Sequence, residues 1–203
     1  HYGVDPDKAF ISVFRVPMTH IFLMRWINTL QICVRNNKQG ESSVQTKYIA
    51  IVTGAAQGIG KAITAKLACQ GATVVAVDNN VAIGNAAVSE MTAAGWDVRF
   101  VAADVGKAAD VQKVIDYVAT KCGQLDWIVN NAGISAFKPI DELEVSEFER
   151  ILDVNLKASF LFAKFGAALL RQSANGVIIT ISSTRALMSE PHNEAYATSK
   201  AGL

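Results

Sequence analysis

The chain has 203 residues, 51% of them hydrophobic, and its 19 lysines and arginines nearly balance 18 aspartates and glutamates to give a net charge of +1. This length and composition suit one ordinary domain with a sizeable core, and the near-neutral charge creates no global field that would attract nucleic acid or an acidic membrane. We therefore expect neither a nucleic-acid partner nor a membrane partner.

The three cysteines, Cys33, Cys69 and Cys122, are an odd number and lack the spacing of metal ligands. They predict neither a disulfide framework nor a zinc site. We expect no metal site and a reducing compartment, with the cytoplasm as the default location.

Residues 1–45 differ in composition from the rest of the chain, because no acidic residue occurs between Lys8 and Gly40. The two apolar stretches there are split by Arg25, and each is well short of the ~18 residues that span a bilayer. Organellar targeting is an alternative for a basic segment of this kind, but Asp5 and Asp7 depart from that pattern. We predict an extension without a stable fold of its own, followed by one domain over residues 46–203.

From Thr46 onward, short apolar runs alternate with longer helical patterns, which is typical of successive βαβ units. Ser146 and Glu149 have capping-box spacing and predict the start of a long helix. Strands are predicted over residues 48–53, 73–77, 98–102, 125–129 and 177–182, and helices over 59–69, 81–94, 111–121, 146–171 and 193–203. This order predicts an α/β fold, a Rossmann-like doubly wound parallel sheet of about five strands with helices on both faces.

A glycine-rich segment, TGAAQGIG over residues 53–60, lies where the first predicted strand leads into the first helix. Glycine permits a tight turn there, lets backbone amides approach a pyrophosphate, and leaves room for close helix packing. The helix N-terminus adds a favourable partial charge for phosphate. The segment therefore predicts a dinucleotide site that includes Gly54, Gln57, Gly58, Ile59 and Gly60.

Asp78 closes the second predicted strand, 18 positions after Gly60. A carboxylate at this point can accept hydrogen bonds from both hydroxyls of an adenosine ribose. It would repel a 2′-phosphate, and neither Asn79 nor Asn80 offers a compensating positive charge. Asp78 thus favours NAD over NADP, and the alternative is a strand-end aspartate that faces water.

Tyr196 and Lys200 lie four residues apart near the end of the chain, and Ser183 precedes Tyr196 by thirteen positions. On a helix the ammonium group and the phenol share one face, so the positive charge favours the ionised tyrosine. A free phenol titrates near pH ~10, and such a charge is the simplest way to bring it closer to neutrality. The spacing makes Tyr196 a candidate acid/base, although an exposed helix pair would give the same pattern.

Taken together, these elements resemble the short-chain dehydrogenase/reductase family from about Lys47 to the end of the chain. The resemblance rests on TGAAQGIG, Asp78, Asp104-Val105, Asn130-Asn131-Ala132-Gly133, Asn155, Ser183, Tyr196 and Lys200, in that order. It implies that Asp104 and Val105 lie beside an adenine ring. It also implies that the Asn130–Gly133 segment, with Asn131, Ala132 and Gly133, stabilises the sheet and lines the cofactor groove.

The resemblance implies a catalytic role for four residues. Ser183 would hydrogen-bond the substrate oxygen, and Tyr196 would take or give its proton while hydride passes between the substrate carbon and the nicotinamide. Lys200 would hold the nicotinamide ribose and stabilise the tyrosinate. Asn155 would distort its helix locally and hold a water that links the lysine to solvent. His192 is expected to face solvent or the substrate rim rather than to act as the base.

Members of this family usually continue for roughly fifty residues beyond the lysine. The resemblance implies that this part supplies two further strands, the rest of the catalytic helix and a substrate loop. We expect the 203-residue chain by itself to be inactive, its last predicted strand to be an exposed edge, and the full-length form to be a homodimer or homotetramer.

The predicted function is hydride transfer between a nicotinamide cofactor and an alcohol or carbonyl substrate. Two alternatives remain, a non-catalytic nucleotide-binding relative and a truncated product with only an interaction role. Sugars, polyols, steroids and acyl carbonyls all remain possible substrates, because the sequence does not define the substrate pocket.

Overall fold

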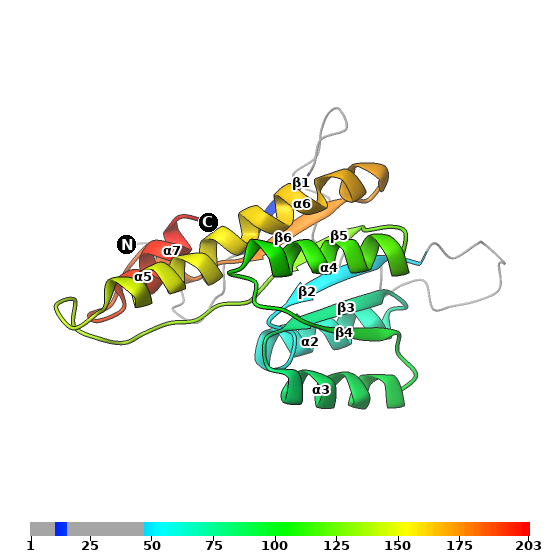
Figure 1. The fold of residues 1–203 in the computed structure, drawn as a ribbon, viewed down its shortest axis with the longest axis horizontal. Coiled ribbons are helices and arrows are strands. Elements are labelled where there is room, and N and C mark those ends of the chain that lie inside the picture. Colours follow the sequence, from blue (N-terminus) through cyan, green and yellow to red (C-terminus); the bar gives the residue numbers. More distant parts are fainter. Residues whose placement is uncertain (1–10, 16–46) are drawn as a thin grey trace, which may run out of the picture.

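The computed structural model of the chain describes residues 11–15 and 47–203, whose strands form a sheet with helices on both faces (Figure 1). The six strands, in spatial order, are β1 (Ile11–Arg15), β6 (Val177–Ile181), β5 (Trp127–Asn130), β2 (Ile49–Thr53), β3 (Thr73–Asp78) and β4 (Val98–Ala102). Neighbouring strands from β6 to β4 are parallel. The predicted doubly wound parallel sheet is confirmed.

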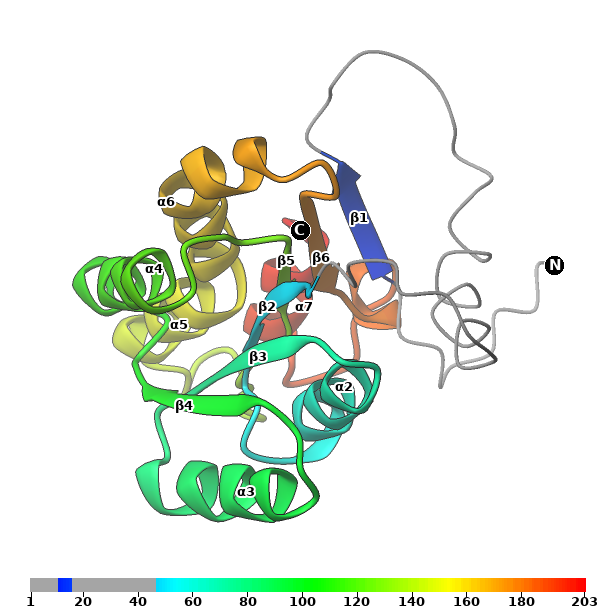
Figure 2. The same ribbon diagram turned by 90° about the vertical axis from the view of Figure 1, so that its right-hand side faces the viewer.

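The helices are α2 (Gly58–Cys69), α3 (Val81–Ala93), α4 (Ala108–Lys121), α5 (Val145–Leu152), α6 (Ala158–Gln172) and α7 (Glu194–Ala201). A π-helical segment, Asp153–Lys157, joins α5 to α6, and a short 3₁₀ helix, Thr184–Ala186, follows β6. Figure 2 shows α4 and α6 on the side of the sheet opposite α2. No helix within residues 47–203 is long and apolar enough to cross a bilayer.

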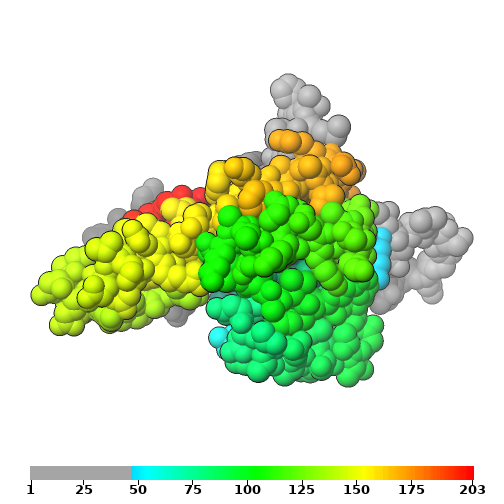
Figure 3. Space-filling view, in the orientation of Figure 1, coloured from blue at the N-terminus to red at the C-terminus, as the bar shows by residue number. Residues whose placement is uncertain are grey.

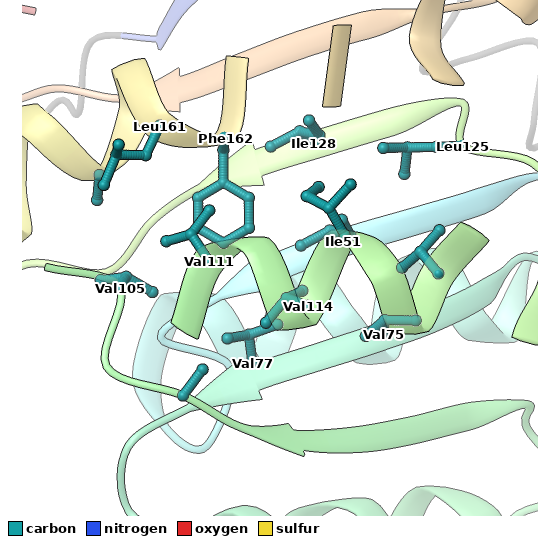
Figure 4. Close-up of a cluster of buried hydrophobic side chains, with 14 of the residues drawn as sticks. Ile51, Val75, Val77, Val105, Val111, Val114, Leu125, Ile128, Leu161 and Phe162 are labelled. Carbon is teal, nitrogen blue, oxygen red and sulfur yellow. The ribbon is translucent and has the colours of Figure 1, made fainter. Parts of the chain in front are cut away.

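The core has two layers because the parallel strands are buried on both faces. One face packs Ile51, Val75 and Val77 against α4 and α6, where Val111 and Phe162 belong to the same cluster (Figure 4). The alternate strand residues form a second cluster with α2 and α3 that includes Ala50, Val52, Val74, Ala76 and Met91. This alternation fixes the register of each strand, since a one-residue slip would exchange the two faces.

The strand order places a topological switch point between β2 and β5. From β2 the chain moves outward through β3 to β4, then crosses the sheet to β5 and continues outward to β6. Ligands of doubly wound sheets bind in the crevice beyond the carboxyl ends of the strands at such a point. The segments after Thr53, Asp78, Ala102 and Asn130 all begin at this edge.

The edge at β6 differs from the prediction of an exposed strand. β1 pairs with β6 in antiparallel fashion, from Ile11 opposite Ile181 to Arg15 opposite Val177. An edge strand presents unpaired N–H and C=O groups, and the pairing satisfies one row of them. The sequence did not predict β1, because its five residues form no helix or strand pattern with their neighbours in the chain. The remainder of the predicted extension, residues 1–10 and 16–45, lies outside the described residues.

The long helix predicted over residues 146–171 consists of α5, the π-helical segment and α6. The predicted cap at Ser146 was wrong. The N-cap is Glu144, whose N–H donates to the Glu147 carboxylate at 3.1 Å, while Ser146 lies exposed within the first turn. Lys138 Nζ also donates to Glu147 at 2.7 Å. Figure 3 shows that α5 and the loop before it, coloured yellow-green, project beyond the body of the sheet.

Candidate active site

A groove of about 370 Å³ lies beyond the carboxyl ends of β2, β3, β4 and β5. This volume falls within the range of small-molecule sites. Its lining comprises Gly54, Gln57, Ile59, Asp78, Asn79, Ala103, Asp104, Val105, Asn131, Ala132, Gly133, Ile134, Arg150 and Val154. Nine of the predicted cofactor residues are therefore brought together, whereas Gly58, Gly60, Tyr196 and Lys200 are not part of the lining, nor is Ser183.

The glycine-rich turn is built around the contact between Gly54 and Gly60. Gly54 has φ +64°, and a Cβ on Gly60 would lie 2.0 Å from the Gly54 carbonyl oxygen. Helix α2 can therefore approach the end of β2 only with glycine at position 60. Gly58, at φ +54°, is exposed at the helix start, and a Cβ there would meet nothing within 4 Å. Neither Gly58 nor Gly60 lines the groove itself.

Asp78 is fixed at the end of β3 by two backbone hydrogen bonds. The N–H of Ala56 donates to Oδ2 at 3.0 Å, and the N–H of Asn80 donates to Oδ1 at 3.0 Å. The carboxylate thus joins the glycine-rich turn to the start of α3, where Asn80 caps the helix through the N–H of Ile83. This geometry holds Asp78 in the groove wall rather than leaving it as a free surface carboxylate.

The segment after β5 is tied to β2 through Thr53. The Thr53 hydroxyl accepts the N–H groups of Asn131 and Ala132, each at 3.0 Å, and the Asn131 amide donates to the Thr53 carbonyl at 3.0 Å. Of the two roles that the resemblance implies for this segment, Asn130 has the position for stabilising the sheet and does not line the groove. Its side chain is buried within the sheet, where it donates to the Thr180 hydroxyl at 3.3 Å, so its role is architectural.

Asp104, after β4, is held by an arginine that the sequence did not predict. Arg150 Nη2 donates to Asp104 Oδ1 at 2.8 Å, and the N–H of Gly106 donates to the same oxygen at 3.1 Å. Burial raises the pKa of the Asp104 carboxyl, but these two hydrogen bonds outweigh that effect and lower it. Arg150 is the only cation that lines the described groove, and it is paired.

Asn155 lies in the π-helical segment, so the local distortion expected at this residue is present. Its side chain joins three elements. Oδ1 accepts the N–H of Ile134 at 2.8 Å, and Nδ2 donates to the Ile134 carbonyl and to Ser199 Oγ, both at 2.9 Å. Ser199 in turn donates to the carbonyl of Tyr196 at 2.7 Å. The wide turn therefore places Asn155 where it connects the loop after β5 to helix α7.

Lys200 and Tyr196 are brought together on α7. Lys200 is 5% exposed, its Nζ lies 5.6 Å from the centroid of the Tyr196 ring, and it donates to the Ile181 carbonyl at 2.9 Å. Burial lowers the pKa of Lys200 from its usual 10.5 to about 8. A Cβ on Gly133 would lie 3.6 Å from Lys200 Nζ and 3.5 Å from Asn155 Oδ1. The side chains of Lys200 and Asn155 therefore lie close to Gly133, which lines the groove.

The two serines after β6 differ in burial and in hydrogen bonding. Ser182 is buried and its hydroxyl donates to the Lys200 carbonyl at 3.1 Å, whereas Ser183 is half-buried and its hydroxyl accepts the N–H of Arg185 at 3.2 Å. Ser183 keeps its own proton for another acceptor. His192 is exposed, with φ +66°, in the loop before α7.

Groove residues beyond the predicted set are Asn79, Ala103, Ile134, Arg150 and Val154. Ile134 could have been found, because it directly follows the Asn130–Gly133 segment. Arg150 gave no signal, since its partner is 46 residues away in sequence. Within residues 47–203, no group of three acidic, histidine or cysteine side chains has the arrangement of a metal site.

The chain resembles known proteins over the same region. It is 38% identical over 153 residues to a 3beta-hydroxysteroid dehydrogenase of Mediterraneibacter gnavus, which covers 75% of this chain and 55% of that protein. A short chain dehydrogenase/reductase from Burkholderia phymatum in complex with NAD has a TM-score of 0.74 at 28% identity, over 77% of this chain and 56% of that one. A metagenomic short-chain oxidoreductase in complex with NADP has a TM-score of 0.73 at 34% identity, over 77% and 71%.

The chain spans between 55% and 60% of the length of the first curated relatives that it matches. The model of the family described as short chain dehydrogenase matches residues 48–203, which include the groove, Asn155, Ser183, Tyr196 and Lys200. On this match and on the fold and groove described above, the chain belongs to the short-chain dehydrogenase family.

Proposed function

We propose that the protein containing this chain is a nicotinamide-dependent oxidoreductase that interconverts an alcohol and a carbonyl compound, with NAD preferred to NADP. The observation that carries the proposal is the buried ammonium of Lys200 beside the Tyr196 ring, next to a groove suited to a dinucleotide. The cofactor, when bound, supplies the nicotinamide carbon that accepts or donates hydride.

The residues of the groove fit such a cofactor. The contact between Gly54 and Gly60 leaves no side chain where a pyrophosphate would approach the N-terminus of α2. The fixed carboxylate of Asp78 can accept hydrogen bonds from ribose hydroxyls, and the lining offers no unpaired cation for a 2′-phosphate. Asp104 and Val105 would hold the adenine end, and Lys200 the nicotinamide ribose.

The chain's own residues would move the proton. An ammonium group held near the phenol favours the tyrosinate, and its effect is stronger in a site from which water is excluded. With a pKa of about 8, Lys200 keeps its charge at neutral pH. Tyr196 would then exchange a proton with the substrate oxygen, which Ser183 would orient through its hydroxyl.

The buried lysine also favours catalysis over the two alternatives. A non-catalytic nucleotide-binding relative or an interaction product has no need for a lysine ammonium that is 5% exposed and has no carboxylate partner within the described residues. Burying such a charge is costly, so its presence argues for a chemical role.

The test is NAD reduction with a panel of secondary alcohols that includes polyols, cyclic alcohols and hydroxysteroids, using the protein that contains this chain as wild type and as its Tyr196→Phe and Tyr117→Phe variants. Tyr117 is a half-buried tyrosine of α4 that packs against the core. We expect Tyr196→Phe to lose about 10²- to 10⁴-fold in kcat with NADH affinity unchanged, and Tyr117→Phe to retain both. If Tyr196→Phe turns over normally, the assignment of the acid/base is wrong; if wild-type protein binds no NADH, the function itself is wrong.

The NAD preference has a separate test in the dissociation constants of NADH and NADPH. Because Asp78 would repel a 2′-phosphate, wild-type protein should bind NADH at least about tenfold more tightly. Asp78→Ala should remove most of this preference by weakening NADH and strengthening NADPH. Equal affinities in the wild-type protein would contradict the proposed preference.

A further inference from the structure

Arg150 has no part in the proton transfer proposed above, yet it occupies a central place beside the groove. It projects from α5 and lines both the groove and a second hollow formed with Ile134, Ser135, Ala136, Ser146, Glu147 and Ile151. Its guanidinium joins α5 to the loop after β4 through the 2.8 Å hydrogen bond to Asp104. An arginine in this place connects two elements that are distant in sequence.

The Arg150–Asp104 contact lies close to the backbone of Gly106. A Cβ on Gly106 would lie 2.5 Å from Arg150 Nη1 and 3.4 Å from Asp104 Oδ1. Gly106 has no positive φ, so a side chain there would conflict with the position of Arg150 rather than with the backbone conformation. The guanidinium lies against Gly106, and a larger residue at position 106 would displace it.

Both hydrogen bonds to Asp104 involve one of its oxygens. Oδ1 accepts from Arg150 and from the N–H of Gly106, whereas Oδ2 faces Lys107 Nζ at 3.8 Å. Each carboxylate oxygen has two lone pairs, so Oδ2 keeps the capacity to accept a hydrogen bond from a ligand. The Lys107 side chain is 70% exposed, and its contact is therefore loose.

We infer that Arg150 is a positioning residue for the cofactor, which orients the ionised Asp104 carboxylate so that Oδ2 accepts a hydrogen bond from the amino group of the adenine ring. The inference rests on the proposed function, because it concerns the same groove. A planar guanidinium with several donors can fix a carboxylate in one orientation, which a single exposed ammonium group cannot do. Arg150 would act through Asp104 and would not touch the adenine itself.

The experiment measures the dissociation constants of NADH and of its hypoxanthine analogue, deamino-NADH, by calorimetry with the protein that contains this chain. The analogue carries an oxygen in place of the adenine amino group and cannot donate to a carboxylate at that point. We expect the wild-type protein to prefer NADH by about tenfold, which is the contribution of one hydrogen bond to a charged group. Arg150→Met should reduce this ratio to about one.

Three further variants separate orientation from charge and from folding. Lys107→Met removes the same unit charge near Asp104 but not the hydrogen bond, so it should keep the preference for NADH. Gly106→Ala should displace the guanidinium and lose the preference although Arg150 is intact. Arg150→Lys keeps the charge and should restore part of the preference. Melting temperatures of the ligand-free variants should lie within a few degrees of wild type.

The outcomes distinguish the two proposals. A wild-type protein that binds neither dinucleotide would contradict the proposed function. A wild-type protein that prefers NADH, together with an Arg150→Met variant that keeps that preference, would overturn the role of Arg150 alone. Equal weakening of both dinucleotides in Arg150→Met would also overturn it, because a merely structural residue would not discriminate between them.

Discussion

Lys200 shows how a single side chain can serve the site at the expense of stability. Its ammonium is buried, and the hydrogen bond that holds it goes to the neutral Ile181 carbonyl. A depressed lysine pKa means that the folded protein binds the proton more weakly than the unfolded chain does. The charge that we propose to activate Tyr196 is therefore a destabilising feature of the fold itself.

Lys200→Met should raise the free energy of unfolding at pH 7 by about 2 kcal/mol, from about 3 kcal/mol of relieved burial less about 1 kcal/mol for the lost hydrogen bond. Below pH 8 both states hold the proton and the cost is complete. Between about 8 and 10.5 the unfolded chain binds more protons, so wild-type stability rises with pH and the advantage of the variant disappears. Urea unfolding at several pH values measures this.

Lys66→Met is the matched control, because Lys66 is exposed on α2. Its stability should stay within about 0.5 kcal/mol of wild type at every pH. A Lys200→Met variant that is less stable than wild type at pH 7 would refute the account of Lys200.

At the scale of elements, the close contact between the end of β2 and helix α2 shapes the glycine-rich wall of the groove. The oxygen of Gly54 occupies the space that any side chain at position 60 would need. Helix α2 packs on the sheet through Thr64 and Ala68, so it cannot shift away from the turn without losing these buried contacts.

Gly60→Ala should destabilise the protein by at least about 3 kcal/mol and abolish NADH binding, because the new methyl group meets backbone rather than a flexible side chain. Gly58→Ala adds the same methyl group in open space and should cost only about 1 kcal/mol for its left-handed φ. Urea unfolding and NADH titration of both variants make the comparison. Equal effects on stability would show that packing at position 60 is not the cause.

The sequence could predict what depends on local spacing. The glycine-rich turn, Asp78 and the Tyr196–Lys200 pair belong to single turns or strand ends, whose geometry follows from the element that carries them. Arg150 and β1 could not be found in this way, because their partners are 46 or more residues away and the periodicity of a helix or strand says nothing about them. The π-helical turn was expected only from the family resemblance, since propensities do not distinguish it from an α-helix.

For the whole molecule, one end of the sheet carries the groove and the other end contains buried hydrogen bonds that stabilise the fold. The groove lies at the carboxyl ends of the strands, and the opposite end is held by Asp126, which is 1% exposed. Its side chain accepts the N–H of Ile49 at 2.7 Å, the amide of Gln124 at 2.6 Å and the hydroxyl of Ser173. One carboxylate therefore joins β2, β5 and the turn before β6.

Asp126→Ala should lower the free energy of unfolding by about 3 kcal/mol, because it leaves buried donors without an acceptor. NADH affinity should change by less than about twofold, since the groove is at the other end of the strands. Asp116→Ala, which alters an exposed aspartate of α4, should leave both quantities unchanged. A large loss of NADH affinity in folded Asp126→Ala would contradict this separation of stability from binding.

The π-helical turn at Asp153–Lys157 also constrains how the length of this chain can vary in evolution. Ala158 N–H donates to the Asp153 carbonyl five residues back, so the turn contains one residue more than an α-helix needs. Deleting that residue would rotate α5 by about 100° relative to α6 and carry Arg150 and Asn155 away from their partners. Between β5 and the end of α6, insertions and deletions should therefore be confined to the loop before α5.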